Sequence, residues 1–249
     1  MPETLADRWQ AVQGRIAAAC ARAGREPAGV RVVAVTKTFG PEQVSEALAA
    51  GLRVFGENRV QEAAHKIPLC PGQAEWHLVG HLQRNKARDA VELFRTIHSV
   101  DSPRLMEAVQ RFAEARGVVM PVFVEVNVSG EGSKCGAAPE SVAALLEGAN
   151  RFMNVNVVGL MTIPPFNVER EAARPFFRKL RDLRDGLRAT TGFALDELSM
   201  GMSGDFEVAI EEGATWIRLG TALFGPRQSA WKPASADGPA GETPEAGEA

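Results

Sequence analysis

The chain has 249 residues, of which 45% are hydrophobic and 24% charged, and its formal net charge is −3. This balance is typical of a globular protein with a large core, and the length suits one α/β barrel domain. A net negative charge argues against a nucleic-acid partner, which needs a dominant basic face. The three cysteines, Cys20, Cys70 and Cys135, form no CxxC pair, so we expect neither a disulfide framework nor a metal site.

The first ten residues, MPETLADRWQ, lack the apolar core of a signal peptide, and no apolar run has the length of a membrane span. We therefore expect a cytoplasmic protein that does not contact a membrane.

The predicted elements begin with an amphipathic helix within residues 3–24, followed by a buried strand at 30–36. The helix is indicated by apolar residues at three- and four-residue spacing, and the strand by the β-branched run VRVVAVT. The periodic positions of the helix are Leu5, Trp9, Val12, Ile16 and Cys20, with Gly24 as the stop.

Strands and helices then alternate along the chain. Further strands are predicted at 52–56, 76–80, 96–100, 122–128, 155–161, 197–200 and 215–219. Helices are predicted at 41–50, 60–67, 85–94, 103–115, 141–152, 169–189 and 205–212. About eight βα units favour a single TIM-like (β/α)8 barrel over residues 1–225, with the first helix as an addition. An open doubly wound sheet is the alternative, because one sequence does not reveal strand order.

Residues 226–249 are rich in proline, alanine, glycine and glutamate, which predicts a disordered tail. Trp231 is the one residue of this stretch that we expect could pack back on the barrel.

Barrel enzymes carry their chemistry at the C-terminal ends of the strands. Here that rule selects a mostly polar set: Lys37, Asn58, His81, Asp101, Asn127, Ser129, Met161, Thr162, and the stretches 199–203 and 218–221. Lys37 ends an apolar strand, where desolvation would lower the pKa of its amine and prepare it to attack an aldehyde. A lysine that simply extends to solvent is the competing interpretation.

The glycine-rich segments LSMGMSGD and IRLGTALFG follow the last two predicted strands. Backbone N–H groups at helix N-termini bind phosphate, and many barrels hold phosphate after strands seven and eight. Ser203 and Thr221 could begin the helices there, although ordinary tight turns use the same residues. An amine and a phosphate cup suit pyridoxal 5'-phosphate (PLP) or the sugar phosphate of a Schiff-base aldolase.

Several motifs in order resemble the pyridoxal-phosphate homeostasis proteins, relatives of the N-terminal barrel of alanine racemase. They are AVTKTFG, FGENRVQE, WHLVGHLQRNK, HSVD, VNVSGEGSKCG, GLMTIPPF, LSMGMSGDFEVAI and IRLGTALFG, and the resemblance runs from about residue 30 to 225. It implies a (β/α)8 barrel of the alanine racemase N-terminal type. Arg59 stands where the family often has a tyrosine, so the packing beside Asn58 is open.

The resemblance also assigns roles to residues. It implies that Lys37 forms the internal aldimine with PLP and that Arg218 faces the pyridine nitrogen. Phosphate would be bound by Ser203, Gly220 and Thr221, and the cofactor would be lined by Asn58, His81 and Met161. A permanent cation at the ring nitrogen disfavours its protonation and weakens the ring as an electron sink.

By this resemblance the protein serves vitamin B6 homeostasis: it binds PLP and related vitamers, hands PLP to apo-enzymes, and has no assigned catalytic residue. The alternative is a PLP-dependent amino-acid racemase of low activity. In alanine racemase the second acid/base is a tyrosine from the partner's C-terminal domain, whereas this sequence has no tyrosine. We also expect no room for such a domain after Gly225, and hence a monomer.

Other polar residues have simpler interpretations. His65, His77 and His98 are expected to be structural or surface residues, Asp101 to cap the helix near residue 103, and Asp205 to point away from phosphate. The run RKLRDLRDGLR indicates the solvated face of a helix. Lys134 is either a solvated loop lysine, which we favour, or a second amine that takes up the aldehyde during transfer.

Overall fold

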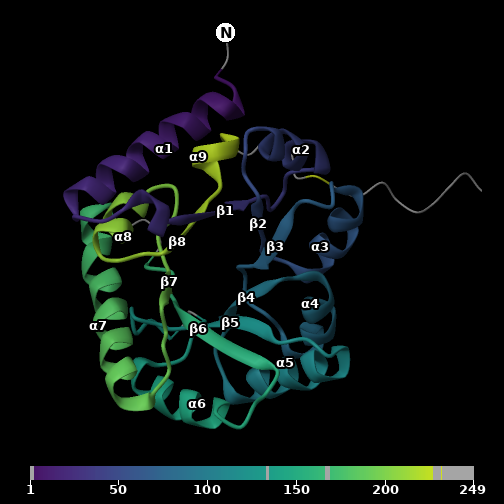
Figure 1. The fold of residues 1–249 in the computed structure, drawn as a ribbon, viewed down its shortest axis with the longest axis vertical. Coiled ribbons are helices and arrows are strands. Elements are labelled where there is room, and N and C mark those ends of the chain that lie inside the picture. The colour runs from purple at the N-terminus through teal and green to yellow at the C-terminus, as the bar shows by residue number, and fades with distance from the viewer. Residues whose placement is uncertain (1–2, 133–134, 166–168, 227–230, 232–249) are drawn as a thin grey trace, which may run out of the picture.

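A computed structural model describes residues 3–132, 135–165, 169–226 and 231. In this part of the chain eight parallel strands follow one another in sequence order around one closed barrel, and the last pairs with the first (Figure 1). The (β/α)8 prediction is therefore confirmed, and the open sheet was the wrong alternative. The strands are β1 (Arg31–Val35), β2 (Val54–Glu57), β3 (Glu75–Leu78), β4 (Thr96–Val100), β5 (Met120–Glu125), β6 (Val155–Met161), β7 (Glu197–Ser199) and β8 (Trp216–Leu219).

Helices surround the barrel, and each predicted helix is present (Figure 1). The helices are α1 (Leu5–Arg22), α2 (Pro41–Ala49), α3 (Val60–Lys66), α4 (Ala87–Leu93), α5 (Pro103–Arg116), α6 (Val142–Ala149), α7 (Arg174–Thr191), α8 (Phe206–Glu211) and α9 (Thr221–Phe224). In the described part of the chain, no helix is long and apolar enough to cross a membrane.

The structure differs from the sequence prediction mainly at element ends. The strand predicted at 122–128 ends at Glu125, because the chain then pairs with a loop. The Ala137 N–H donates to the Glu125 carbonyl, and the Asn127 N–H donates to the Ala137 carbonyl. The helix predicted at 169–189 begins only at Arg174, after a short 3-10 turn.

Two apolar clusters hold the barrel, as expected when alternate side chains of a strand face opposite sides of the sheet. The larger one lies between the strands and the helices. The smaller one consists of Val33, Val35, Val79, Phe123, Met161 and Trp216. Burying a side chain of this size stabilises the fold by roughly 1.5–3 kcal/mol.

The additional helix α1 is also confirmed, and it packs beside α8 and α9 (Figure 1). Thr4 and Asp7 form a capping box at its start, which satisfies two of the free N–H groups there. Its buried face includes Leu5, Val12 and Ile16. The predicted spacing therefore identified the side that faces the barrel.

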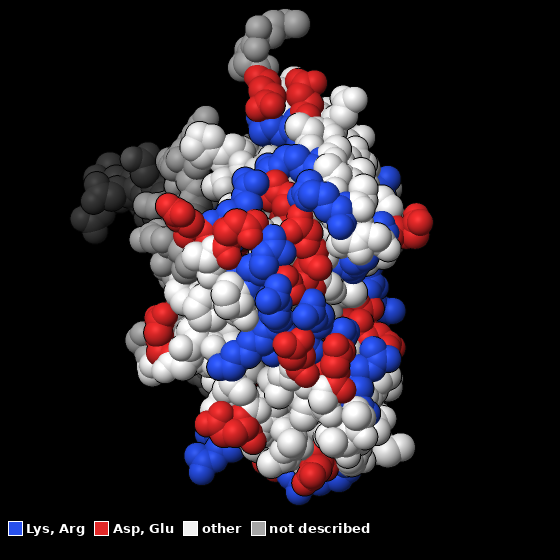
Figure 2. Space-filling model, turned by 90° about the vertical axis from the view of Figure 1, so that its left-hand side faces the viewer, with Lys and Arg blue, Asp and Glu red and all other residues white. Residues whose placement is uncertain are grey.

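A strip of alternating charge covers this side of the molecule (Figure 2). Glu212 accepts hydrogen bonds from Arg174, Arg178 and Arg181 of α7, and Arg22 of α1 pairs with Glu211 at 2.7 Å. The charge run predicted as a solvated helix face thus also joins α7 to the segment around α8.

Candidate functional site

A cavity of about 490 Å³ opens at the C-terminal ends of the strands. Its walls come mainly from the loops after β1, β2, β3, β7 and β8. The lining residues are Val35, Lys37, Asn58, Val79, Gly80, His81, Glu125, Cys135, Ile163, Met202, Ser203, Gly204, Arg218, Gly220 and Thr221. The structure therefore brings the strand-one lysine and the two glycine-rich loops to one place.

Met161 is the predicted site residue that does not line this cavity. Its side chain is fully buried in the inner cluster of the barrel, against residues such as Phe123 and Trp216. Ile163, two residues later, lines the cavity in its stead. Met161 thus supports the floor of the cavity from inside the barrel.

The segment that carries Lys37 is fixed by a buried ion pair. The Lys66 Nζ lies 2.8 Å from Glu57 Oε1 and donates to the Thr36 carbonyl at 2.9 Å, and both charged side chains are fully buried. The Thr36 hydroxyl donates to the same Glu57 oxygen at 2.6 Å. Burial raises the pKa of Glu57, because desolvation outweighs the attraction of Lys66. Lys37 itself is half-buried.

The residue after Lys37 has a strained backbone. Thr38 has φ +72°, a left-handed conformation that a β-branched residue rarely adopts. Its N–H donates to Glu62 Oε1 at 2.8 Å, and its carbonyl accepts from the Trp231 N–H at 2.9 Å. The expected return of Trp231 to the barrel is confirmed, and it contacts the loop of Lys37.

The opposite side of the cavity is built around Ser203. Its Oγ accepts hydrogen bonds from the N–H groups of Gly220 at 3.2 Å and Ala222 at 3.1 Å, so the hydroxyl proton can be donated to a ligand. The N–H groups of Ser203, Gly204 and Thr221 have no acceptor in the described part of the chain. Together these donors form a cup suited to a phosphate group.

The residues near this cup differ in detail from the prediction. Thr221 does begin a helix, α9, but α8 begins at Phe206, after Ser203. Asp205 does not line the cavity, and its Oδ1 accepts from the Met202 N–H at 2.6 Å. Its negative charge therefore supports the loop backbone.

Arg218 lies in β8 at the floor of the cavity and is only 4% exposed. Its Nη1 donates to Ser199 Oγ at 2.8 Å and its Nη2 to the Thr162 carbonyl at 2.9 Å. Desolvation lowers the pKa of Arg218 to about 10, while Asp205 and Glu125 oppose that shift. The guanidinium therefore stays charged at neutral pH, and its plane is fixed by two bonds.

Glu125 is a cavity residue that the sequence analysis missed. Burial, with a smaller contribution from Asp101, raises its pKa to about 7, and Arg218 opposes the shift. Its Oε2 is buried without a hydrogen-bond partner in the described residues. A charged residue at a strand end was the available signal, but the prediction placed that end at residue 128. Cys135, also in the lining, was missed as well.

His81 and Asp101 lie together at the rim. The His81 Nδ1 is 3.6 Å from Asp101 Oδ2, and the His81 side chain is 46% exposed. The cap of α5 is Ser102, so the prediction that Asp101 caps this helix was wrong. The Asn58 backbone packs closely against Gly80, where a Cβ atom would clash with the Asn58 carbonyl oxygen.

The remaining candidates lie elsewhere. His65 is exposed, whereas His77 and His98 are buried inside the barrel. Asn127 and Ser129 bond to each other in a turn outside the cavity lining. Lys134 lies outside the described residues, so its role stays a hypothesis.

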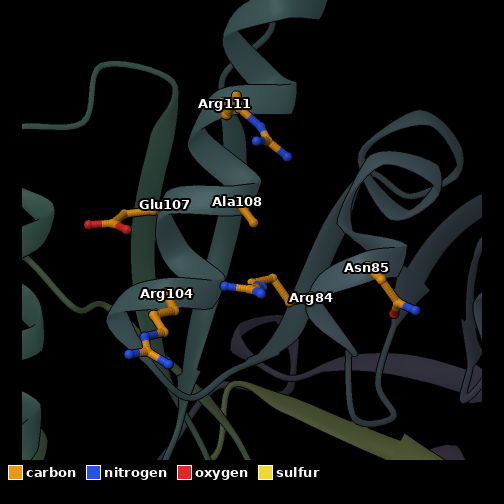
Figure 3. Close-up of a pocket in the computed structure, with 6 residues that line it drawn as sticks. All are labelled: Arg84, Asn85, Arg104, Glu107, Ala108 and Arg111. Atoms are coloured by element: carbon orange, nitrogen blue, oxygen red, sulfur yellow. The ribbon is translucent and has the colours of Figure 1, made fainter.

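A second cavity, of about 580 Å³, lies on the outside of the barrel beside α4 and α5 (Figure 3). Arg84, Arg104 and Arg111 extend around it from exposed positions, together with Asn85, Glu107 and Ala108. It does not include Lys37 or the two glycine-rich loops. The amine and the anion-binding groups therefore meet in the cavity at the barrel mouth.

Comparison with known proteins identifies similar chains. The profile of the family described as "Alanine racemase, N-terminal domain" matches residues 9–228. A pyridoxal phosphate homeostasis protein from Aquifex aeolicus is 46% identical over 89% of this chain and 98% of its own length. One from Pseudomonas aeruginosa is 46% identical over 90% of this chain and 96% of its own length.

A solved structure shows the same fold. PipY of Synechococcus elongatus PCC7942, with PLP bound, is 38% identical with a TM-score of 0.78, and the match covers 89% of this chain and all of that one. The similarity spans nearly the whole barrel.

Proposed function

Since the chain belongs to the family of the pyridoxal phosphate homeostasis proteins, which share the alanine racemase N-terminal domain, we propose that it binds PLP in the cavity at the barrel mouth and serves vitamin B6 homeostasis. The observation that carries this proposal is the convergence of Lys37, Arg218 and the Ser203 cup on one cavity.

The residues present fit such a ligand. Ser203 and the free N–H groups beside it offer several donors to a phosphate, and Lys37 is in the same cavity to meet an aldehyde. The Lys37 amine would condense with the aldehyde, forming one C=N bond and releasing one water. Bound in this way, PLP would supply an electron-withdrawing ring.

The chain's own residues favour retention over catalysis. Arg218 is a buried permanent cation, and next to a ring nitrogen it would keep that nitrogen unprotonated and the ring a weak electron sink. The sequence has no tyrosine to act as the second acid/base of a racemase. Racemases work within the limit that such an arginine sets, so it is the missing tyrosine that supports a carrier, one that holds PLP and related vitamers and delivers PLP to apo-enzymes. A monomeric state and a cytoplasmic location stay predictions.

The test is an absorbance spectrum of the protein incubated with PLP. We expect wild type to show the band of a Schiff base and Lys37→Ala to lack it. After borohydride reduction, mass mapping should locate the added mass on Lys37. Lys86→Ala is the control, since Lys86 lies outside the cavity lining, and it should bind like wild type. An adduct that survives Lys37→Ala contradicts the proposal.

An assay of alanine racemisation addresses the competing enzyme function. If the protein is a carrier, the loaded wild type should show no more turnover than Lys37→Ala. Sustained turnover that depends on Lys37 would support the racemase in place of the carrier.

A further inference from the structure

Polar side chains run through the interior of the barrel, which in this fold is usually filled by apolar layers. His77 of β3, His98 of β4 and Ser199 of β7 are at most 1% exposed. Each bonds to the next: His77 Nδ1 lies 3.0 Å from His98 Nε2, and His98 Nδ1 lies 2.8 Å from Ser199 Oγ. They are the middle members of a longer series of hydrogen-bonded side chains, which we call the file.

The two ends of this file lie at opposite ends of the barrel. Ser199 Oγ accepts from Arg218 Nη1 at 2.8 Å in the floor of the cavity. His77 Nε2 lies 3.0 Å from Oε1 of Glu75, the first residue of β3, whose side chain is 47% exposed. One chain of hydrogen bonds therefore joins the cavity cation to a surface carboxylate at the far end.

The donors and acceptors fix the direction of every bond. The Glu75 carboxylate can only accept, so a neutral His77 carries its proton on Nε2 and must accept at Nδ1. At the other end Arg218 can only donate, so Ser199 accepts from it and keeps its own proton for Nδ1 of His98. His98 then carries its proton on Nε2 and donates it to Nδ1 of His77, which in turn donates from Nε2 to the Glu75 carboxylate. Burial lowers the pKa of both histidines, which agrees with two neutral rings.

The rings have little freedom to leave this arrangement. His98 stacks on Phe123 with the ring centres 4.3 Å apart, and His77 lies 5.1 Å from the ring of Trp216. Packing thus restricts the orientation of both imidazole rings. The common direction of the hydrogen bonds fixes which nitrogen of each ring carries the proton. Ser199 Oγ is therefore held as an acceptor for Arg218.

We propose that Glu75, His77, His98 and Ser199 are positioning residues for Arg218, and that they set how its cation faces a ligand in the cavity. This inference rests on the proposed function, because its effect is read on bound PLP. The residues touch no ligand themselves. They act by holding the guanidinium plane, and through it they keep the ligand's ring nitrogen unprotonated.

The first measurement needs no cofactor. In the apo protein labelled with 15N-histidine, NMR should show His77 and His98 as neutral rings with the proton on Nε2 near neutral pH. Glu75→Gln removes the surface carboxylate that fixes the His77 proton, so both rings should then populate two tautomers. Glu26→Gln is the control, a glutamate that precedes β1 at the same end of the barrel. Rings that are unchanged in Glu75→Gln overturn the inference.

The second measurement is the pH titration of the absorbance band of the PLP-loaded protein. Ser199→Ala removes the acceptor of one guanidinium nitrogen, so Arg218 is held less firmly beside the ring nitrogen of PLP. The ring nitrogen should then gain proton affinity, and the midpoint of its titration should rise by about one pH unit. Thr96→Val, a buried near-isosteric change on β4 outside the file, should leave the midpoint in place. A midpoint unchanged in Ser199→Ala contradicts the proposal.

If Ser199→Ala does not fold, the exposed Glu75→Gln variant decides. Its midpoint must move by more than that of Glu26→Gln, an effect from the far end of the barrel that local packing at the cavity would not produce. If wild type shows no Schiff-base band, the proposed function fails. If wild type loads through Lys37 but neither variant shifts the midpoint, this inference alone fails.

Discussion

At the scale of single residues, burial decides the charge of the cavity floor. Arg218 and Glu125 are 4% and 6% exposed, so each is desolvated and each pKa moves toward the neutral form. The arginine still keeps its charge at neutral pH, because its pKa falls only to about 10. Glu125 has a pKa of about 7, so its charge changes in the physiological range.

The first prediction concerns Glu125. Its pKa is raised from 4.5, so the folded state binds more protons than the unfolded state between about pH 4.5 and 7, and the free energy of unfolding falls as pH rises through that window. Glu125→Gln removes this loss, worth at most about 3 kcal/mol. We therefore expect the variant to gain stability over wild type between about pH 5 and 8, measured by urea denaturation.

The control for this prediction is Glu140→Gln. Glu140 is an exposed glutamate that lies a few residues after Cys135 in the sequence and outside the cavity lining. Glu125→Gln should differ from wild type by an amount that changes more with pH than the difference for this control. A difference between Glu125→Gln and wild type that is the same at both ends of the pH range would show that Glu125 titrates normally.

At the scale of elements, the loop after β1 is held by α3. Lys66 at the end of α3 bonds to Glu57 of β2 and to the carbonyl of Thr36, next to Lys37. Glu62, one turn earlier in α3, holds the N–H of Thr38. The candidate nucleophile thus sits on a short strained segment whose two sides are fixed by one helix.

The second prediction is that Lys66→Met destabilises the fold strongly. It leaves the carboxylate of Glu57 buried without its cation, which costs roughly 3–5 kcal/mol. The double variant Glu57→Gln with Lys66→Met should regain much of that loss. Urea denaturation of both variants and of Lys86→Ala measures the effect, and a Lys66→Met protein as stable as wild type would disprove this role of the ion pair.

At the scale of the whole molecule, a closed barrel gathers the ends of all its strands into one mouth. The Lys37 amine of the first unit and the Ser203 cup of the last two units are neighbours because β8 pairs with β1. The proposed ligand would lie across this junction. Such a mouth would suit the proposed holding and release of PLP.

The third prediction follows from the proposed carrier function. PLP-loaded protein should reactivate an apo-aminotransferase with a yield that matches the PLP it holds. Borohydride-reduced protein, in which the link to Lys37 cannot hydrolyse, should not reactivate it. Equal reactivation by reduced and unreduced protein would mean that free PLP in the preparation is responsible.

Much of the fold could be predicted from the sequence, because apolar periodicity reports local geometry. The eight strands and the first helix follow from spacings within each segment, and Lys37 stands out as a charge at the end of an apolar run. Glu125 was missed because the end of β5 depends on pairing with Ala137, which lies beyond a turn. The family resemblance placed Met161 in the cavity lining, but a motif at a strand end does not tell which way its side chain faces.

The sequence by itself determined the βα rhythm, the family and the position of the candidate amine, since each depends on residues close together in the chain. Only the tertiary structure decided that the barrel closes, that Lys66 supports Lys37, and that His77 and His98 connect Glu75 to Arg218. These contacts join residues on different strands and helices. Their existence depends on register, closure and burial, and those are properties of the packed chain as a whole.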